Sequence, residues 1–572
     1  MVEVLPTQQG LSLPALIWDL RADLRRRFRS ADPTLRSKWM AWLVTSGTKE
    51  YRALLDAGFM IHWLSRQAVD YPGLSPLQQL IWHARPDVQM VHALPQDTAE
   101  YLGWFFCHGV GEHALWPWLT ASERRQACMT EGPWQAALLQ QASDAMLLDA
   151  ESPAESYPLG VNLVGYVHGQ LGIGEDVRMA ARALDAVGVP MALINFKPGH
   201  DVAQNDMTWR HRVVELGPYG TNVFCLTAME HGRFVAERGF GQTRGRINIG
   251  YWPWELGNWP ATWRQLVHLV DEVWVSTRHT LEAVSPACAA LMPPVPVRLM
   301  PMAVTVDEVP RYKSAKALEA ARRATRLRWH LPVGACLFCF SFDLNSSIHR
   351  KNPVAVLKAF QRAFSPDLNV AEQVGLVIKV HPPARPHPTW TLLKAWAKQD
   401  PRLHLIEETL PRTDLLQLYQ ACDAFVSLHR AEGFGRGIAE ALQLGLRVVT
   451  TGYSGNVDFC QRPEFADRAH MVKYRLIKVR RGQYPYAQGQ EWANADVKHA
   501  AQCLREVAAQ VKARGGRLLP VPVGGWPVFS AAEVGQRYRD RLREIWRHSS
   551  VAPGGQAASG NARLQSGIVP HS

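Results

Sequence analysis

The stretch Ala424-Phe-Val-Ser-Leu-His-Arg-Ala-Glu-Gly-Phe-Gly-Arg-Gly-Ile-Ala-Glu-Ala441 decides the fold. It begins with the apolar run Ala424–Leu428, passes through a glycine-rich turn, and ends with the apolar spacing of an amphipathic helix. A strand, a glycine turn and a helix in this order are typical of α/β proteins, whose ligands bind at the carboxyl ends of parallel strands. The pattern therefore predicts an α/β fold with a ligand site after residue 428.

Two carboxylates mark this turn as a candidate site. Glu432 lies in the turn and Glu440 in the helix, with seven residues between them. The backbone N–H groups of Gly433, Phe434 and Gly435 can hold a phosphate or a sugar, and carboxylates accept hydrogen bonds from hydroxyl groups. The spacing alone arises by chance in most proteins, but its place after this turn makes it specific.

A second motif supplies positive charge. Arg350 and Lys351 follow the apolar run Cys336–Phe342 and precede a predicted helix, Val354–Phe364. Paired cations at a sheet edge can neutralise a diphosphate leaving group, as a metal ion would. Ordinary surface charges are the alternative, and we favour it less because cations at a helix start oppose the helix dipole at a cost of about 0.3–1 kcal/mol.

Strand-like runs alternate with helical segments in two successive series, which predicts two Rossmann-like, doubly wound domains facing a cleft. We expect the first in residues 151–310 and the second in residues 311–548, with a terminal crossover helix at Ser530–Trp546. Cys336 and Cys339 form a C-x-x-C, which we interpret as part of a strand and not as a redox or zinc motif. The predicted strands are Val161–Val167, Met191–Ile194, Asn222–Leu226, Glu272–Ser276, Cys336–Phe342, Val374–Val380, His404–Ile406, Ala424–Leu428 and Arg447–Thr450.

The loop from His168 to Asp176 follows the first of these strands and opens the predicted helix Glu175–Ala186. Gly172 and Gly174 would let the backbone approach a ligand at the helix start. The spacing does not match that of nicotinamide-dinucleotide loops. A tight turn without a ligand is an equally good interpretation of this loop.

Residues 1–150 predict an all-helical extension, because apolar residues recur there at helical spacing. Trp42, Gly47 and Glu50 have counterparts 62 residues later in Trp104, Gly109 and Glu112, so we expect an internal repeat. The basic run 25–29 could contact an anionic membrane or form a solvated helix face. The tail, residues 549–572, has the composition of a disordered segment.

The formal net charge of +12 favours acidic partners: nucleic acid, anionic lipid or phosphorylated small molecules. No nucleic-acid-binding motif accompanies this charge, so we expect no nucleic-acid partner. The nine scattered cysteines fit a reducing cytoplasm. We see no secretory signal and no membrane span, and expect a cytoplasmic protein that contacts the inner membrane face peripherally.

From about residue 160 to 547 the sequence resembles the retaining family 4 glycosyltransferases with the GT-B fold, especially their bacterial mannosyltransferase-like branch. The matching blocks together cover about two thirds of the chain, and the first 150 residues lie outside them. Related sequences often have an acidic residue and proline where this chain has Asn494-Ala495. The blocks are 342–353, 427–435, 451–459, Gly250-Tyr-Trp-Pro-Trp-Glu255-Leu, Tyr484-Pro485 and Trp492-Ala493-x-x-Asp496.

The resemblance implies a role for each matching residue. Arg350 and Lys351 would bind the donor diphosphate, Glu432 the transferred sugar, and Glu440 the ribose. Gly433, Phe434 and Gly435 would contact the donor through their backbone, and from the loop pattern alone we add Gly172 and Gly174 as donor-binding candidates. Ser454, Gly455 and Asn456 would close the far side of the donor pocket. His168 and Glu255 are acceptor-side candidates, although a structural role for His168 is as good an interpretation.

The implied activity is hexose transfer, with retention of configuration, from a nucleotide diphosphate sugar to a glycan or lipid-linked oligosaccharide. The resemblance implies no required cofactor or metal; GDP-mannose is the preferred donor, and UDP-sugars stay open. One alternative is transfer to a protein acceptor that docks on the helical extension. Another is a non-catalytic scaffold on a degenerate transferase fold, which the presence of all four charged site residues disfavours.

Overall fold

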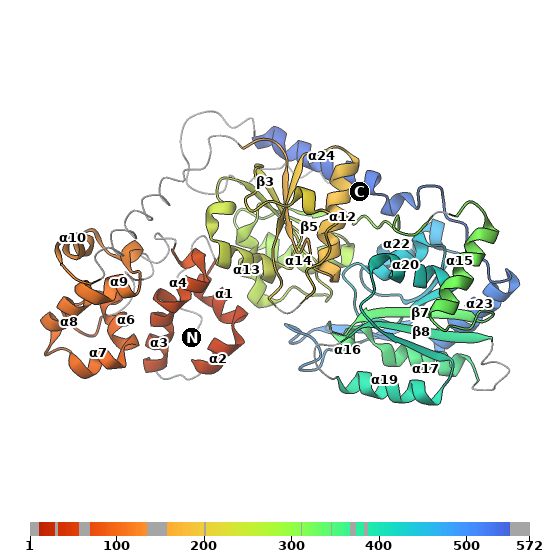
Figure 1. The fold of residues 1–572 in the computed structure, drawn as a ribbon, viewed down its shortest axis with the longest axis horizontal. Helices are drawn as coiled ribbons and strands as arrows, with labels where there is room; N and C mark the ends of the chain where they lie inside the picture. The colour runs from red at the N-terminus through yellow and green to blue at the C-terminus, as the bar shows by residue number, and fades with distance from the viewer. Residues whose placement is uncertain are drawn as a thin grey trace.

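The computed structural model describes residues 11–28, 33–55, 64, 69–133, 157–199, 202–310, 312–344, 346–365, 373–382 and 387–549. In Figure 1 the helical extension, a first α/β lobe and a second α/β lobe follow one another along the long axis of the molecule. The predicted domain boundary near residue 150 and the tail 550–572 lie outside the described residues.

The first lobe is a parallel sheet of six strands in the order β2-β1-β3-β4-β5-β6. Helices cover it on both sides, which is why β1 and β3 are buried along their whole length. The strands are β1 Val161–Gly165, β2 Met191–Asn195, β3 Thr221–Phe224, β4 Ile247–Tyr251, β5 Glu272–Val275 and β6 Val297–Leu299; the main helices are α12 Gly172–Ala186, α13 Ala228–Arg238, η6 Ala261–Leu269 and α14 Arg278–Ala289.

The second lobe repeats this plan in the order β12-β11-β10-β7-β8-β9, also parallel. A separate antiparallel hairpin, β13–β14, extends from it. The strands are β7 Cys336–Asp343, β8 Val374–His381, β9 Leu403–Glu407, β10 Ala424–Ser427, β11 Arg447–Thr451, β12 Ala469–Val472, β13 Tyr474–Lys478 and β14 Glu491–Ala495; the helices are α15 Ala315–Arg328, α16 Ile348–Lys351, α17 Pro353–Ala363, α19 Pro388–Gln399, α20 Arg412–Ala421, α21 Arg436–Gln443, α22 Val457–Cys460 and α23 Val497–Ala513.

The terminal helix α24, Ala531–Ser549, leaves the second lobe and packs on α12 of the first (Figure 1). There the buried hydroxyl of Tyr538 donates to the carbonyl of Pro301 over 2.8 Å, and Arg541 pairs with the buried Glu272. The two six-stranded parallel sheets and this crossover helix confirm the predicted fold class. Cys336 and Cys339 lie on β7 as free thiols.

The named elements in the described residues of the extension are all helices, joined by turns and loops. Its first helix packs against α13 of the first lobe: Leu16 is fully buried, and the N–H of Ser12 donates to the side chain of Gln265 over 3.1 Å. Its first two helices are separated at Arg21, whose backbone is extended. The helices are α1 Leu13–Leu20, α2 Ala22–Arg27, α3 Pro33–Val44, α4 Ser46–Glu50, η1 Arg52–Leu55, α6 Pro76–Ala84, α7 Pro86–Val91, α8 Thr98–Trp104, η2 Phe105–Gly109, α9 Val110–Glu112, η3 Trp116–Trp118 and α10 Ala121–Met129.

One arrangement of side chains occurs twice in the extension. Arg21 binds Asp23 and Glu50 and lies 5.7 Å from the centre of the Trp42 ring. The second arginine, Arg85, binds Asp87 and Glu112 and lies 5.2 Å from the Trp104 ring. In both, a Cβ on the following glycine would come within 3.1 Å of the tryptophan ring. The sequence echo thus corresponds to two units with the same internal contacts.

Candidate active site

Three of the predicted residues form one charged cluster at the end of β10. The Glu432 carboxylate lies 2.5 Å from Nζ of Lys351 and 3.0 Å from Nη1 of Arg350. Arg350 and Glu432 are 6% and 9% exposed, so the three charges lie in a largely water-free setting. Lys351 and Glu432, 81 positions apart in the sequence, are thereby joined by a partly buried ion pair.

The two cations are positioned by a short helical turn. Ser347 caps α16 by accepting the Arg350 N–H at 3.2 Å, and Asn352 ends it in the left-handed region, with φ of 54°. The Asn352 side chain donates to the carbonyl of Leu428 over 2.9 Å, which fixes this turn to the end of β10. Arg350 and Lys351 therefore lie at the end of the separate turn α16 and not in the first turn of α17. The unfavourable interaction with the dipole of the following helix, considered from the sequence, does not apply to them in that form.

Burial alone would raise the pKa of Glu432, because it disfavours the charged form. The attraction of Lys351 and Arg350 outweighs this and lowers the pKa to about 2. The site thus holds one full negative charge between two cations, which is the arrangement that an anionic ligand would compete for.

Close backbone packing supports the glycine turn. The N–H of Glu432 donates to Ser454 Oγ over 2.8 Å, and the N–H of Gly455 donates to the carbonyl of Glu432 over 2.9 Å. A Cβ on Gly455 would lie 2.1 Å from the Gly433 carbonyl oxygen, and Gly435 has φ of 95°. Both positions require glycine. The predicted residues of this turn and of the 454–456 loop therefore form one unit beneath Glu432, with Phe434 packed on the Phe459 ring.

Asn456 contacts His429, a residue for which the sequence analysis predicts no role. His429 is fully buried; its Nε2 lies 3.1 Å from Asn456 Oδ1 and its Nδ1 lies 3.0 Å from Ser427 Oγ. Burial lowers the pKa of His429, so the ring is held neutral. His429 and Asn456 thus tie the two loops together under the charged cluster.

Glu440, the predicted ribose ligand, has a cation of its own. Its Oε1 accepts a hydrogen bond from Arg412 Nη1 at 2.8 Å, and the same guanidinium lies 3.4 Å from Glu175 of the first lobe. Glu440 is 3% exposed. Arg412 was not predicted, because a single arginine at the start of α20 carries no recognisable pattern.

The first lobe brings Glu255 to the cluster. One carboxylate oxygen of Glu255 lies 3.7 Å from Arg350 Nη2, and the other accepts a hydrogen bond from the Tyr484 hydroxyl at 2.6 Å. Tyr484 lies in the loop of the β13–β14 hairpin. It was noted as part of a matching block, without a role. Residues of both lobes therefore meet at Arg350.

The loop of the first lobe lies elsewhere along the same interface. Gly172 begins α12, with open space where a Cβ would be, whereas a Cβ on Gly174 would come within 2.3 Å of the Gly169 carbonyl. Asp176, on α12, pairs with Arg436 at the start of α21. His168 Nδ1 lies 2.7 Å from the carbonyl of Asp206, a contact that suits a structural role. The described contacts do not bring His168 to the charged cluster.

Residues 394–464 match the family model described as Glycosyl transferases group 1. The matched segment contains Glu432, Glu440 and the 454–456 loop. The protein is a glycosyltransferase. Its two Rossmann-like lobes have the arrangement of the GT-B fold, and its charged cluster lies where these lobes meet.

Solved structures with a similar chain path include three proteins at low sequence identity. Sucrose-phosphate synthase from Thermosynechococcus elongatus is 14% identical, with a TM-score of 0.45 over 68% of this chain and 100% of its own. HepE from Anabaena, in complex with UDP and glucose, is 12% identical, with a TM-score of 0.43 over the same shares. The α,α-trehalose 6-phosphate synthase from Burkholderia multivorans is 11% identical, with a TM-score of 0.42 over 68% and 99%. No curated protein matches this glycosyltransferase by sequence.

Among the helices of the described residues, none is long and apolar enough to cross a bilayer.

Proposed function

We propose that this glycosyltransferase moves a hexose from a nucleotide diphosphate sugar to a glycan or lipid-linked oligosaccharide, with retention of configuration. The observation that carries this proposal is the Glu432 carboxylate held between Arg350 and Lys351 where the two lobes meet. A site that already balances two cations with one carboxylate is suited to exchange that carboxylate for a diphosphate.

Donor binding would change the partners within the cluster. The diphosphate oxygens take over Arg350 and Lys351, and Glu432 turns to accept hydrogen bonds from hydroxyls of the transferred sugar. As the bond between sugar and phosphate breaks, negative charge grows on the leaving diphosphate, and the two fixed cations stabilise it without reorganising. The N–H groups of residues 433–435 and the second oxygen of Glu440 complete the donor contacts, the latter at the ribose.

GDP-mannose is our preferred donor, on the sequence resemblance to the mannosyltransferase-like branch, and UDP-sugars are the alternative. Arg350 and Lys351 supply the charge that a divalent ion supplies in other transferases, so we propose that catalysis requires no metal. The acceptor side would be Glu255 and the surrounding surface of the first lobe. We place the enzyme in the cytoplasm, peripherally at the inner membrane face.

A second candidate is transfer to a protein acceptor, because the second repeat unit of the extension exposes apolar side chains. Met90 and Val91 are 83% and 70% exposed at the end of α7. If they dock a protein, the double substitution Met90→Ser and Val91→Ser lowers transfer to that protein and leaves hydrolysis of the donor unchanged. Equal rates on the protein acceptor would remove this candidate.

A thermal-shift panel of nucleotide diphosphates and their sugars, with and without EDTA, tests the proposal. A ligand at a hundredfold excess over its Kd stabilises the native protein by about 2.7 kcal/mol. We expect a shift with GDP and GDP-mannose that EDTA does not change. A shift only with uridine nucleotides would replace the donor, and a shift that EDTA abolishes would contradict metal-free binding. No shift with any nucleotide would favour the non-catalytic scaffold.

A further inference from the structure

The β13–β14 hairpin presents an exposed, basic and partly apolar edge. Its residues 473–483 contain five cations and no acidic residue. β13 pairs only with β14 in a two-stranded sheet, so its other edge carries no strand, and Tyr474 and Leu476 on it are 42% and 49% exposed. We call this surface the basic edge; it consists of Lys473, Tyr474, Arg475, Leu476, Arg480 and Arg481.

The cations of the basic edge have no carboxylate partner among the described residues. In the part of the chain that the structure describes, no ion pair joins its four cations to a carboxylate. Asp496 lies beside it, but its carboxylate accepts the N–H groups of Lys498 and His499 at 2.8 and 3.1 Å and so caps α23. The edge therefore offers positive charge to something outside the chain.

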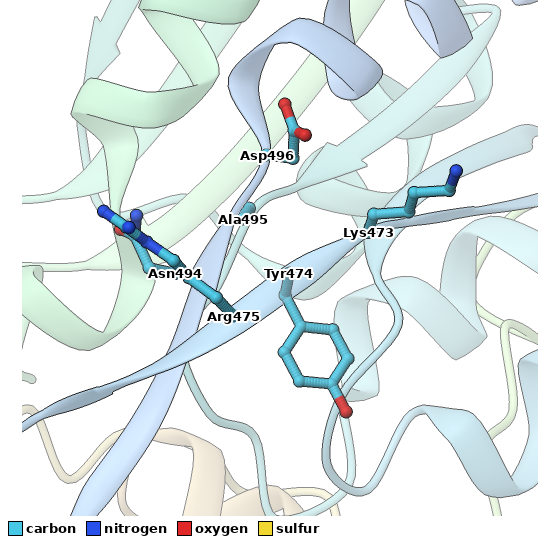
Figure 2. A pocket seen from close by; sticks show the side chains of 6 residues that line it. All are labelled: Lys473, Tyr474, Arg475, Asn494, Ala495 and Asp496. Atoms are coloured by element: carbon cyan, nitrogen blue, oxygen red, sulfur yellow. The ribbon is translucent and has the colours of Figure 1, made fainter.

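A pocket at the base of the hairpin belongs to the same surface. Figure 2 shows Lys473, Tyr474 and Arg475 extending in different directions around it, with Asn494 and Asp496 on the facing strand and beyond. Because Lys473 and Arg475 extend away from each other, each can contact a separate phosphate headgroup, and the Tyr474 ring is suited to the apolar boundary below such headgroups.

The exposed arginines of the extension lie near the hairpin. Tyr486, in the hairpin loop, packs on Trp263 at 5.2 Å between ring centres. Burial raises the pKa of Tyr486, the nearby Asp19 carboxylate raises it further, and Arg25 lowers it. The helix η6 that carries Trp263 also contacts the extension, because its Gln265 side chain accepts the N–H of Ser12 over 3.1 Å. The hairpin loop and the start of the extension therefore pack against the same helix.

We propose that the basic edge, continued by Arg26 and Arg27 of α2, is a docking surface for an anionic membrane. Cations alone would suit any polyanion. Cations and the exposed Tyr474 and Leu476 alternate between the two faces of β13, so a partner that meets the strand at its edge contacts both kinds of side chain, which favours a lipid interface. The inference rests on the proposed function, because Tyr484 in the loop of the same hairpin is hydrogen-bonded to Glu255 beside the charged cluster. Docking there places the reaction site next to a lipid-borne acceptor.

Co-sedimentation of the full chain with vesicles tests this surface. We expect binding to phosphatidylcholine vesicles that contain phosphatidylglycerol, weak binding to pure phosphatidylcholine, and loss of binding at high salt. The triple variant Arg475→Glu, Arg480→Glu, Arg481→Glu should bind about 100-fold more weakly, because each cation near an anionic surface contributes about tenfold or less. The matched control, Lys313→Glu, Lys316→Glu, Arg323→Glu, changes the net charge equally at exposed positions on and before α15 and should bind almost as wild type.

Two further measurements separate the alternatives. The double variant Tyr474→Ser, Leu476→Ser should lose vesicle binding several-fold and keep its binding to soluble dextran sulfate. Equal loss in both charge variants, or unchanged vesicle binding by the Tyr474/Leu476 variant, would overturn the membrane assignment, the second result in favour of an acidic polymer. Nucleotide-induced thermal shifts are read on the same proteins: a chain that binds GDP but no vesicles refutes the docking surface alone, and one that binds vesicles but no nucleotide refutes the proposed donor chemistry alone.

Discussion

The hydroxyl of Tyr484, on the hairpin of the second lobe, donates a 2.6 Å hydrogen bond to the carboxylate of Glu255 in the first lobe. The other oxygen of that carboxylate faces Arg350. One carboxylate thus links the hairpin, the first lobe and the cation that we assign to the donor diphosphate. This contact adds to the other ion pairs between the lobes, which include Asp176 with Arg436 and Glu175 with Arg412.

Removal of this phenol should weaken catalysis moderately. A hydrogen bond to a charged group contributes about 1.5–3 kcal/mol, and part of this is recovered through water in the variant. We expect Tyr484→Phe to lower kcat/KM by about 3- to 30-fold in a steady-state transfer assay, with the melting temperature nearly unchanged. Tyr312→Phe, at a half-buried tyrosine outside the site, is the control. A normal rate in Tyr484→Phe would show that the bond between the lobes does not help catalysis.

Lys351→Ala should lower turnover by roughly 100-fold or more while the fold stays intact. The reason is the loss of a fixed charge partner for the leaving diphosphate. Turnover at saturating donor and the circular dichroism spectrum are the two measurements. Lys358→Ala removes an exposed lysine from the neighbouring helix α17 and should be neutral. A normal rate in the Lys351 variant would refute the phosphate assignment.

Glu432→Gln should separate binding from catalysis. The carboxylate competes with a diphosphate for Arg350 and Lys351, so its neutral isostere should bind GDP at least as tightly as the wild type, as measured by isothermal titration calorimetry. Turnover should nevertheless fall by about 100-fold, because the amide is a poorer acceptor for the sugar hydroxyls in the transition state. Weaker GDP binding together with unchanged turnover would contradict both assigned roles.

Sequence patterns predicted the elements whose physical signal is local. β7 and β10 are continuous apolar runs buried between helices, and both were placed within a residue of their observed ends. β4 was missed because Asn248 and Gly250 interrupt its apolar pattern. β6 was missed because it is short and only partly buried at the sheet edge. β4 and β6 form strands because of their pairing and burial against neighbouring elements, and sequence periodicity does not report either.

The site residues likewise divide into those with a local sequence motif and those recognised only through distant contacts. Arg350, Lys351 and Glu432 were found because each stands in a motif at the end of a strand, where parallel sheets gather their ligands. The partners of Glu255 and Glu440 were not found. Tyr484 lies 229 residues from Glu255, and Arg412 precedes Glu440 by 28. Neither distance corresponds to a periodicity of a helix or strand, so only the packing of the two lobes reveals these pairs.

Acid should destabilise the protein through the two buried carboxylates that bind arginine and lysine. Burial opposes ionisation of both Glu175 and Glu432, yet neighbouring cations lower each pKa from the ordinary 4.5 to about 2. A carboxylate whose pKa is lower in the folded state stabilises that state above about pH 4.5, and this contribution is lost as the pH falls toward 2, because the unfolded chain binds the proton first. Each group should add a slope of about 1.4 kcal/mol per pH unit in this window.

Melting temperatures measured between pH 5 and pH 3 on Glu175→Gln and Glu432→Gln check the sign and the origin of this slope. Each variant should be less stable than the wild type at pH 5, because it leaves buried cations without their partner, and should lose less stability on acidification. Glu100→Gln, at an exposed position on α8, should follow the wild-type curve. If the melting temperatures of all three variants fall with pH as steeply as that of the wild type, these ion pairs do not govern acid stability. The low pKa values of Glu175 and Glu432 would then be wrong.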